Sequence, residues 1–462
     1  MALPFNELYA FACGFLSALI LFFFSAPFIS YPRPSLIVIS LLVIYLSVSL
    51  DWLLSLNGEN VVSYVVIFDA GSTGSRARVY TLRSNASEKC LYELVNEKAF
   101  SVEPGLSEFV SLPNESAEYL QPLLDRVKKC IPPKKWAETP IILRATAGLR
   151  LLPNETASAI LESVAGVFNK SGFRLPVQGA VSILDGTDEG FFAWLSLQFL
   201  RGGSCLGKDL STAPKTTSQA IFDLGGASFQ LAFLTTSVES NEGVHSLPSA
   251  YEGTQFAPLG GKFFAHSYLG LGLMTAMHSM LLRSSNLSAA ESTRHLQSPC
   301  FPANTTGTWS HGREKWTVSF GPQGPQSLPD RAFNECFKAA VEVIADHGLP
   351  DSHARQLEDL KVLEIQAMSY MCTKTEEAER LSNRPPDGRI PVQWYFDAAK
   401  KFCSSPQPQQ PFMCMELTYV AALLTHGLGL PMDKQLNLNR TIDSVEVGWP
   451  VGFLVDMLHR GL

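Results

Sequence analysis

The sequence has no basic tract. Its 36 Lys and Arg residues are outnumbered by 43 Asp and Glu residues, and the formal net charge is −7. Proteins that bind nucleic acid neutralise many phosphates with clustered Lys and Arg. The composition therefore argues against a nucleic-acid partner, and an anionic ligand has to be held locally, by a metal ion and a few side chains such as Arg76. Nothing in the sequence indicates the oligomeric state.

Cysteine spacing typical of zinc sites is also missing, because no CxxC pair or Cys/His cluster occurs. Cys13 lies in an apolar segment, and the other eight cysteines are Cys90, Cys130, Cys205, Cys300, Cys336, Cys372, Cys403 and Cys414. An even set suits disulfides in an oxidising compartment. Seven N-x-Ser/Thr sequons agree with this, since all follow the apolar N-terminal region. Their asparagines are Asn85, Asn114, Asn154, Asn169, Asn286, Asn304 and Asn439.

Long apolar runs are confined to residues 1–60, which we interpret as a membrane anchor region. Residues 8–29 carry no charge, and as a helix they would extend roughly 33 Å, enough to cross a bilayer. Residues 36–50 form a second run, after a proline-containing turn with Arg33. We expect a transmembrane hairpin with Arg33 in the cytosol and both ends in the lumen. One anchor with an interfacial segment, or a cleaved signal, are the alternatives. No C-terminal span is expected.

The stretch "VVIFDAGSTGSRARVY" at 65–80 places one carboxylate and a glycine-rich loop directly after an apolar run of β-formers. Such a run predicts a strand buried on both faces. The glycines allow close approach, and the hydroxyls lie beside free backbone N–H groups, so the loop can cradle phosphate oxygens. Because two anions repel, Asp69 is expected to hold a hydrated divalent cation that bridges to the phosphate.

A second copy of this pattern, "QAIFDLGGASFQ" at 219–230, places Asp223 154 positions after Asp69. Each copy predicts a strand, a phosphate loop and a returning strand, "RARVYTL" in the first and "FQLAFL" in the second. Two such hairpins facing each other would hold one polyphosphate from both sides. The repeat therefore predicts two lobes with a site between them.

The length and the remaining pattern fit this division. A chain of 462 residues exceeds the usual limit of one hydrophobic core. Helical periodicity at 116–131 and 156–172 flanks a strand and loop at 139–153, which indicates mixed α/β structure, whereas 284–316 is polar and is expected to form irregular surface loops. We expect a first lobe at 61–215, a second lobe at 216–440 and a C-terminal segment at 441–462 that returns to the first lobe.

Five ordered blocks then identify a family resemblance: "DAGSTGSR" at 69–76, "ATAGLRLLP" at 145–153, "LDGTDEGFFAW" at 184–194, "DLGGAS" at 223–228 and "VEVGWPVG" at 445–452. The chain resembles the apyrase family of nucleoside triphosphate diphosphohydrolases, particularly its endoplasmic reticulum and Golgi nucleoside diphosphatase branch. The resemblance covers about residues 61–460. It implies a two-lobed α/β fold of the actin-like, sugar-kinase-like (ribonuclease H-like) type, with the active site in the interlobe cleft.

The resemblance also implies roles for single residues. Glu189 would be the general base, and Ser228 with Gln230 would orient the attacking water. Asp69, Asp223, Thr146 and Trp449 would hold Ca²⁺ or Mg²⁺ through its waters. The residues implied in phosphate binding are Ser72, Thr73, Gly74, Ser75, Arg76, Gly225, Gly226 and Ala227.

Some positions depart from the family pattern. Phe229 stands where the family commonly has Thr, and in a regular strand it would point away from the face of Ser228 and Gln230. Family members clamp the base between aromatic side chains; Tyr370 matches one of them, whereas Leu428 stands at the place of the second.

Two disulfides of this branch, Cys300–Cys336 and Cys403–Cys414, match by position. The remaining cysteines are extra, and by elimination we pair Cys90 with Cys130 and Cys205 with Cys372.

The expected function is cation-dependent hydrolysis of the terminal phosphate of a nucleoside diphosphate, UDP or GDP, to the monophosphate. A membrane-anchored enzyme of the endoplasmic reticulum or Golgi, with its catalytic part in the lumen, would support glycosylation in this way. Secretion or a cell-surface position are alternatives for the location. A broader nucleoside tri- and diphosphatase, or an inactive nucleotide-binding scaffold, are alternatives for the activity.

Overall fold

The structure is a computed structural model. It describes residues 61–84, 90–176, 179–206, 219–235, 243–248, 251, 261–284, 294–301, 305–311, 314–320, 330–349, 353–381, 388–405 and 407–461. The two expected membrane segments lie outside these ranges. Within them, none of the helices has the length and apolar character that a bilayer crossing requires.

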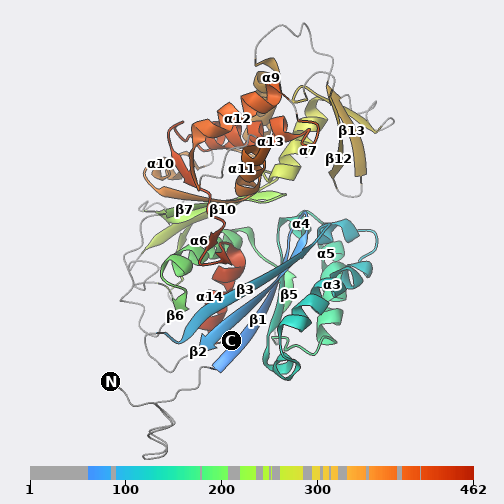
Figure 1. Cartoon of the computed structure of the whole chain (residues 1–462), viewed down its shortest axis with the longest axis vertical. Coiled ribbons are helices and arrows are strands. Elements are labelled where there is room, and N and C mark those ends of the chain that lie inside the picture. Colours follow the sequence, from blue (N-terminus) through green and yellow to red (C-terminus); the bar gives the residue numbers. More distant parts are fainter. Residues whose placement is uncertain are drawn as a thin grey trace, which may run out of the picture. The chain divides into compact units, whose positions relative to one another are not determined.

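The first sheet has six strands in the order β5-β4-β1-β2-β3-β6 (Figure 1). Its strands are β1 Val61–Ala70, β2 Ser75–Ser84, β3 Tyr92–Val102, β4 Ile141–Ala145, β5 Val181–Ile183 and β6 Cys205–Leu206. β1, β2 and β3 form an antiparallel meander, while β4 runs parallel to β1. The predicted strand, loop and returning strand of the first repeat are therefore confirmed.

Side-chain alternation gives the first sheet two apolar faces. Val66 and Phe68 of β1 pack with helices α3 (Glu115–Cys130) and α5 (Asn154–Asn169), as the helical periodicity predicted. Val65 and Ile67 point to the other face, into a core that contains α6 (Gly186–Arg201) and α14 (Trp449–His459). Short helical turns complete this part: η1 Leu106–Phe109, η2 Pro133–Glu138 and α4 Ala147–Arg150.

The second sheet has seven strands in the order β15-β16-β14-β7-β8-β10-β9. They are β7 Gln219–Leu224, β8 Ser228–Thr235, β9 Val244–Ser246, β10 Lys262–Leu269, β14 Glu364–Ser369, β15 Arg389–Pro391 and β16 Gln435–Asn437. Ile221 and Ala232 share the core of α6 and α14: α6 packs on β7, β8 and β10, and α14 packs on α6 and β1, so the pair lies between the two sheets (Figure 1). The opposite face, with Phe222 and Phe229, joins the largest apolar core.

Helices cover that opposite face: α7 Leu273–Ser284, α9 Arg331–Asp346, α10 Ala354–Asp359, α11 Tyr370–Leu381, α12 Val392–Ser404 and α13 Met413–Ala422, which continues as the π-helical turn η5 Leu423–Gly427. A two-stranded hairpin, β17 Thr441–Ile442 with β18 Val445–Glu446, precedes α14. The described elements agree with two lobes, while the lobe boundaries at 215 and 440 stay a prediction.

The expectation of irregular loops over 284–316 is wrong for part of this stretch. β11 (His295–Ser298), β12 (Thr306–His311) and β13 (Glu314–Phe320) form a small sheet (Figure 1). Trp309 and Trp316 are paired across β12 and β13, and both are buried in the core of the second lobe. Because the surrounding residues are polar, the sequence pattern did not indicate that these two tryptophans are buried. Their burial stabilises the short strands.

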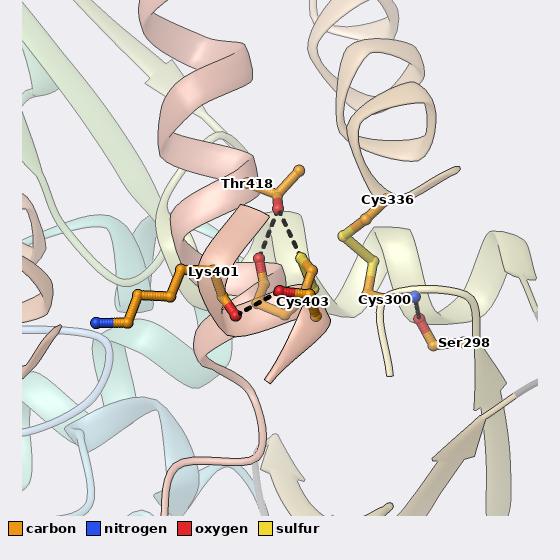
Figure 2. Close-up of a disulfide and its surroundings, with 8 residues drawn as sticks. Ser298, Cys300, Cys336, Lys401, Cys403 and Thr418 are labelled. Atoms are coloured by element: carbon orange, nitrogen blue, oxygen red, sulfur yellow. Dashed lines mark hydrogen bonds between the residues drawn. A yellow bond between two sulfur atoms is a disulfide. The ribbon is translucent and has the colours of Figure 1, made fainter. Parts of the chain in front are cut away.

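Three disulfides are present among the described residues. Cys300–Cys336 and Cys403–Cys414 confirm the two expected pairs (Figure 2). The third is Cys90–Cys205, so the pairing of Cys90 with Cys130 and of Cys205 with Cys372 is wrong. The reason is the antiparallel pairing of Tyr92 in β3 with Leu206 in β6, which brings the adjacent cysteines together.

Candidate active site

The two repeated aspartates come together at the ends of matching strands. Asp69 is the penultimate residue of β1 and Asp223 that of β7, and both line one cavity of about 270 Å³. Thr146 lines the same cavity because it directly follows β4, whose end pairs with the end of β1. Trp449, the first residue of α14, lines the cavity as well and lowers the pKa of Asp69 against the effect of burial. The four residues expected around a metal ion therefore surround one space.

Glu189 enters this cavity from the first turn of α6. The helix begins there because the Asp185 carboxylate accepts a hydrogen bond of 2.8 Å from the Thr187 N–H. Glu189 is only 6% exposed, and its Oε2 accepts bonds from Arg150 at 2.5 Å and from Gln230 Nε2 at 3.3 Å. The Oε2 atom of Glu189 thus accepts hydrogen bonds from Gln230, a predicted catalytic residue, and from Arg150, which was not predicted.

The pKa values of the cavity carboxylates are raised. Burial raises the pKa of Glu189 to about 8, with a positive charge on Arg150 opposing the shift and the nearby Asp223 and Asp69 adding to it. Burial likewise raises the pKa of Asp223 to about 6, although its Oδ1 accepts a 2.5 Å bond from the Ser369 hydroxyl. The pKa of Asp69 is raised by burial too, against the attraction of Arg76, whose Nη1 lies 3.8 Å away.

Alternation along β8 places cavity-lining and core-packing side chains on opposite faces of the strand. Ser228 and Gln230 line the cavity, and the Gln230 Nε2 donates to the Ser228 Oγ. Phe229 points the other way, is fully buried and packs against Phe222 and Tyr268. The prediction that Phe229 serves packing is confirmed, and Ser228 and Gln230 remain on the cavity face of the strand.

The two phosphate loops touch each other across the lobes. A Cβ on Gly226 would lie 2.5 Å from the Ser72 Oγ and 2.7 Å from the Thr73 Cγ2, so a side chain here would force those two side chains to move. Ser72, Thr73, Gly226 and Tyr370 line both the cavity of the carboxylates and a second cavity of about 480 Å³. We call these the carboxylate cavity and the outer cavity. They adjoin at the loop contact.

The other predicted phosphate residues divide into two groups. Arg76 and Gly225 line the carboxylate cavity, and Ala227 lines the outer cavity. Gly74 and Ser75 line neither, so their prediction as phosphate contacts is not supported by their positions. Ser75 is fully buried at the start of β2, and Gly74 lies so close to the Val102 carbonyl that a Cβ would be 2.9 Å from it. These two residues shape the hairpin.

The position of Leu428 does not support its predicted role as one wall of a base clamp. Tyr370 lines both cavities, and its hydroxyl donates to the Thr73 Oγ1 at 3.4 Å. Leu428 lines neither cavity and is 1% exposed in the core of the second lobe. The π-helical turn Leu423–Gly427, closed by a bond from the Leu428 N–H to the Leu423 carbonyl, precedes Leu428 at this core position. Leu428 therefore serves the packing of this core.

Three residues that contact the predicted site residues were not predicted from the sequence. Arg150 bonds to Glu189 and, at 3.4 Å, to the Ser228 Oγ; Ser369 bonds to Asp223; Ser267 accepts from the Gln230 Nε2 at 3.0 Å. Arg150 lies within the quoted block "ATAGLRLLP", which was the available signal. Ser267 and Ser369 carry no local signal, because their roles depend on pairing between strands distant in sequence.

The donor set of the carboxylate cavity fits a hydrated divalent cation. Two buried carboxylates and the Thr146 hydroxyl are hard oxygen donors, and burial raises the pKa of both aspartates although Arg76 lies nearby, so a cation that replaced their lost hydration would be favourable. No group of three His, Cys, Asp or Glu side chains suited to direct coordination occurs in the part of the chain that the structure describes. A cation here would keep most of its waters.

Two glycine loops around buried carboxylates, placed between two sheets, define a phosphate-transferring α/β protein of the actin-like class. The family model of the GDA1/CD39 (nucleoside phosphatase) family matches residues 55–348. The chain belongs to this family of nucleoside phosphatases. The predicted family and its hydrolase class are confirmed.

Curated relatives agree over most of the chain. Ectonucleoside triphosphate diphosphohydrolase 6 of Homo sapiens is 36% identical, over 86% of this chain and 78% of its own length. Nucleoside diphosphate phosphatase ENTPD5 of Homo sapiens is 32% identical, over 86% of this chain and 87% of its own length. Among solved structures, that of nucleoside triphosphate hydrolases from Neospora caninum has a TM-score of 0.59 at 15% identity, covering 90% of this chain and 96% of that one. This likeness supports the two-lobed fold alone.

Proposed function

We propose that the chain hydrolyses the terminal phosphate of nucleoside diphosphates, with UDP or GDP as substrate and Ca²⁺ or Mg²⁺ as cofactor. The observation that carries the proposal is the convergence of Glu189, Ser228 and Gln230 with two buried aspartates in one cavity. Phosphoryl transfer needs positioning and charge stabilisation more than covalent help, and this cavity offers both.

Glu189 acts as the general base. It takes a proton from a water that Ser228 and Gln230 hold between them, and that water's oxygen forms a bond to the terminal phosphorus. The bond from phosphorus to the bridging oxygen breaks, which leaves the nucleoside monophosphate and inorganic phosphate. The same carboxylate would lose its proton to solvent before the next turnover.

The phosphates lie along the contact between the loops. Backbone N–H groups and hydroxyls of Ser72 and Thr73 face them from the first lobe, and Gly225 and Gly226 face them from the second. Asp69, Asp223, Thr146 and Trp449 would hold the hydrated cation. When bound, the cation supplies charge neutralisation at the phosphate oxygens.

The nucleoside extends into the outer cavity. Tyr370 marks the boundary between the two cavities and offers an aromatic face to the base. Apolar Leu152 and Met274 line the same cavity from the two lobes. A base there would have one aromatic partner, Tyr370, and aliphatic neighbours.

The location is part of the proposal. Residues 1–60 would anchor the chain in an endoplasmic reticulum or Golgi membrane with the lobes 61–215 and 216–440 in the lumen. Three disulfides and exposed sequon asparagines at Asn114, Asn154, Asn169 and Asn439 support an oxidising, glycosylating compartment. Hydrolysis of UDP or GDP there would support glycosylation, since it removes the diphosphates that glycosyltransferases release.

The test is phosphate release from UDP, GDP, ADP, ATP and UTP, each with Ca²⁺ or Mg²⁺. We expect the highest kcat/KM for UDP or GDP. Comparable turnover of ATP and UTP would favour a broader tri- and diphosphatase. Nucleotide binding without phosphate release would favour a scaffold and overturn the proposal.

A further inference from the structure

Ser267 holds a position next to the catalytic pair that the mechanism above does not use. It lies on β10, directly opposite Gln230 of β8 in the antiparallel register. The Ser267 Oγ is 3.0 Å from the Gln230 Nε2. On its other side, Ser267 packs so closely against the start of α6 that a Cβ on Gly186 would collide with it. The strand pairing and this packing fix where its hydroxyl lies.

The Gln230 carboxamide faces more acceptors than it can satisfy. Its nitrogen carries two hydrogens, yet three oxygens surround it: the Ser228 Oγ, the Ser267 Oγ at 3.0 Å and the Glu189 Oε2 at 3.3 Å. When Ser267 accepts one hydrogen, only one remains for the two catalytic oxygens. The hydrogen bond to Ser267 therefore sets the rotation of the Gln230 carboxamide. It also sets the strength of the hydrogen bond from Gln230 to Glu189.

We propose that Ser267 is a positioning residue for hydrolysis, which acts through Gln230 to set the geometry of the water-orienting group. The inference rests on the proposed hydrolase mechanism. Ser267 lines neither the carboxylate cavity nor the outer cavity, so it does not touch the nucleotide. Its removal affects the chemical step and leaves substrate binding intact.

The test is a double-mutant cycle with UDP or GDP as substrate, on the full chain. Ser267→Ala alone lowers kcat about fivefold to twentyfold, the effect expected from losing one orienting hydrogen bond, and leaves KM within about twofold. In a Gln230→Ala background, the same substitution changes kcat by less than about twofold, because its only route to the reaction is gone.

Ser171→Ala is the matched control. Its buried hydroxyl bonds only to the backbone of Phe168 and Phe173 in the first lobe, so its loss leaves kcat unchanged even where it lowers Tm. Should Ser267→Ala not fold, Ser267→Cys keeps the volume and weakens the acceptor, and it lowers kcat in the same way.

Normal kcat in a folded Ser267→Ala protein overturns the inference. The inference is also overturned if Ser267→Ala lowers kcat equally in the wild-type and Gln230→Ala backgrounds, since an equal loss indicates a general structural effect. Failure of the wild-type chain to release phosphate is a different outcome, and it rejects the proposed function itself.

Discussion

At the scale of single residues, the site depends on one buried carboxylate held by two donors. Glu189 would be a poor base in water, where its pKa is near 4.5, and a better one here, where burial raises the pKa to about 8. Arg150 restrains this rise while it holds the carboxylate in place at 2.5 Å. Burial thus raises the basicity of Glu189, whereas Arg150 both orients its carboxylate and limits the rise of its pKa.

If the Glu189 carboxylate is the general base, replacing it with the carboxamide of glutamine should lower turnover. Glu189→Gln keeps the size and hydrogen bonding but cannot accept the proton, so kcat should fall by about 10² or more while nucleotide binding persists. Phosphate release and equilibrium binding of the nucleotide, measured on the same preparation, check this. Near-normal turnover would remove Glu189 from the mechanism.

The charge on Arg150 predicts a pH effect. A base works only when deprotonated, so kcat/KM rises with pH through the pKa of Glu189. Arg150 lowers that pKa. In Arg150→Ala the pKa is higher, and the acid limb of the kcat/KM profile should move to higher pH. Arg150→Lys keeps the charge and should move it less. A limb that stays in place in Arg150→Ala would show that another group controls it.

At the scale of elements, two hairpin loops from distant parts of the chain meet where the phosphates pass. In the present arrangement Gly226 leaves room for the side chains of Ser72 and Thr73, which occupy the adjoining space. The strands behind the loops, β1 with β2 and β7 with β8, hold each loop rigidly through antiparallel ladders.

Gly226→Ala tests this contact. The added methyl pushes the loops apart, so kcat/KM should fall by about 10² or more, since displacements near 1 Å at a reacting centre have such effects. Gly166→Ala is the matched control, because a Cβ there meets nothing within 4 Å. It lies inside α5 and should leave activity unchanged and raise stability by about 1 kcal/mol. Equal activity of the two variants would contradict the proposed phosphate path.

At the scale of the whole molecule, each lobe contributes one aspartate to a shared cavity. A cation held by both would stabilise their approach, and two buried carboxylates without it would repel each other. Helix α6 packs on the second sheet, α14 packs on β1 of the first sheet and on α6, and one core joins the lobes through this helix pair.

Metal removal should therefore abolish turnover. Excess chelator should stop phosphate release, and Ca²⁺ or Mg²⁺ should restore it. Asp69→Asn and Asp223→Asn should each lose most of the cation-dependent activity. Asp125→Asn, on the exposed surface of α3, should not. Full activity in the presence of chelator would rule out the cation proposed here.

The sequence by itself determined features that depend on near neighbours. Apolar runs, glycine loops and helical periodicity are local, so β1, β7, α3 and α5 could be predicted, and the repeat around Asp69 and Asp223 already implied two facing loops. The family resemblance predicted roles for Glu189, Ser228 and Gln230, which lie in one cavity. Alternation along a strand was enough to assign Phe229 to packing.

Only the tertiary structure decided contacts between distant segments. Arg150 reaches Glu189 across 39 residues, and Ser267 reaches Gln230 across 37. The Cys90–Cys205 pair depends on the register of an edge strand, and the burial of Leu428 depends on a π-helical turn packed in a core. Such contacts depend on how the elements pack against one another. The local sequence pattern does not encode this packing, because the same periodicity is compatible with several registers and several neighbours.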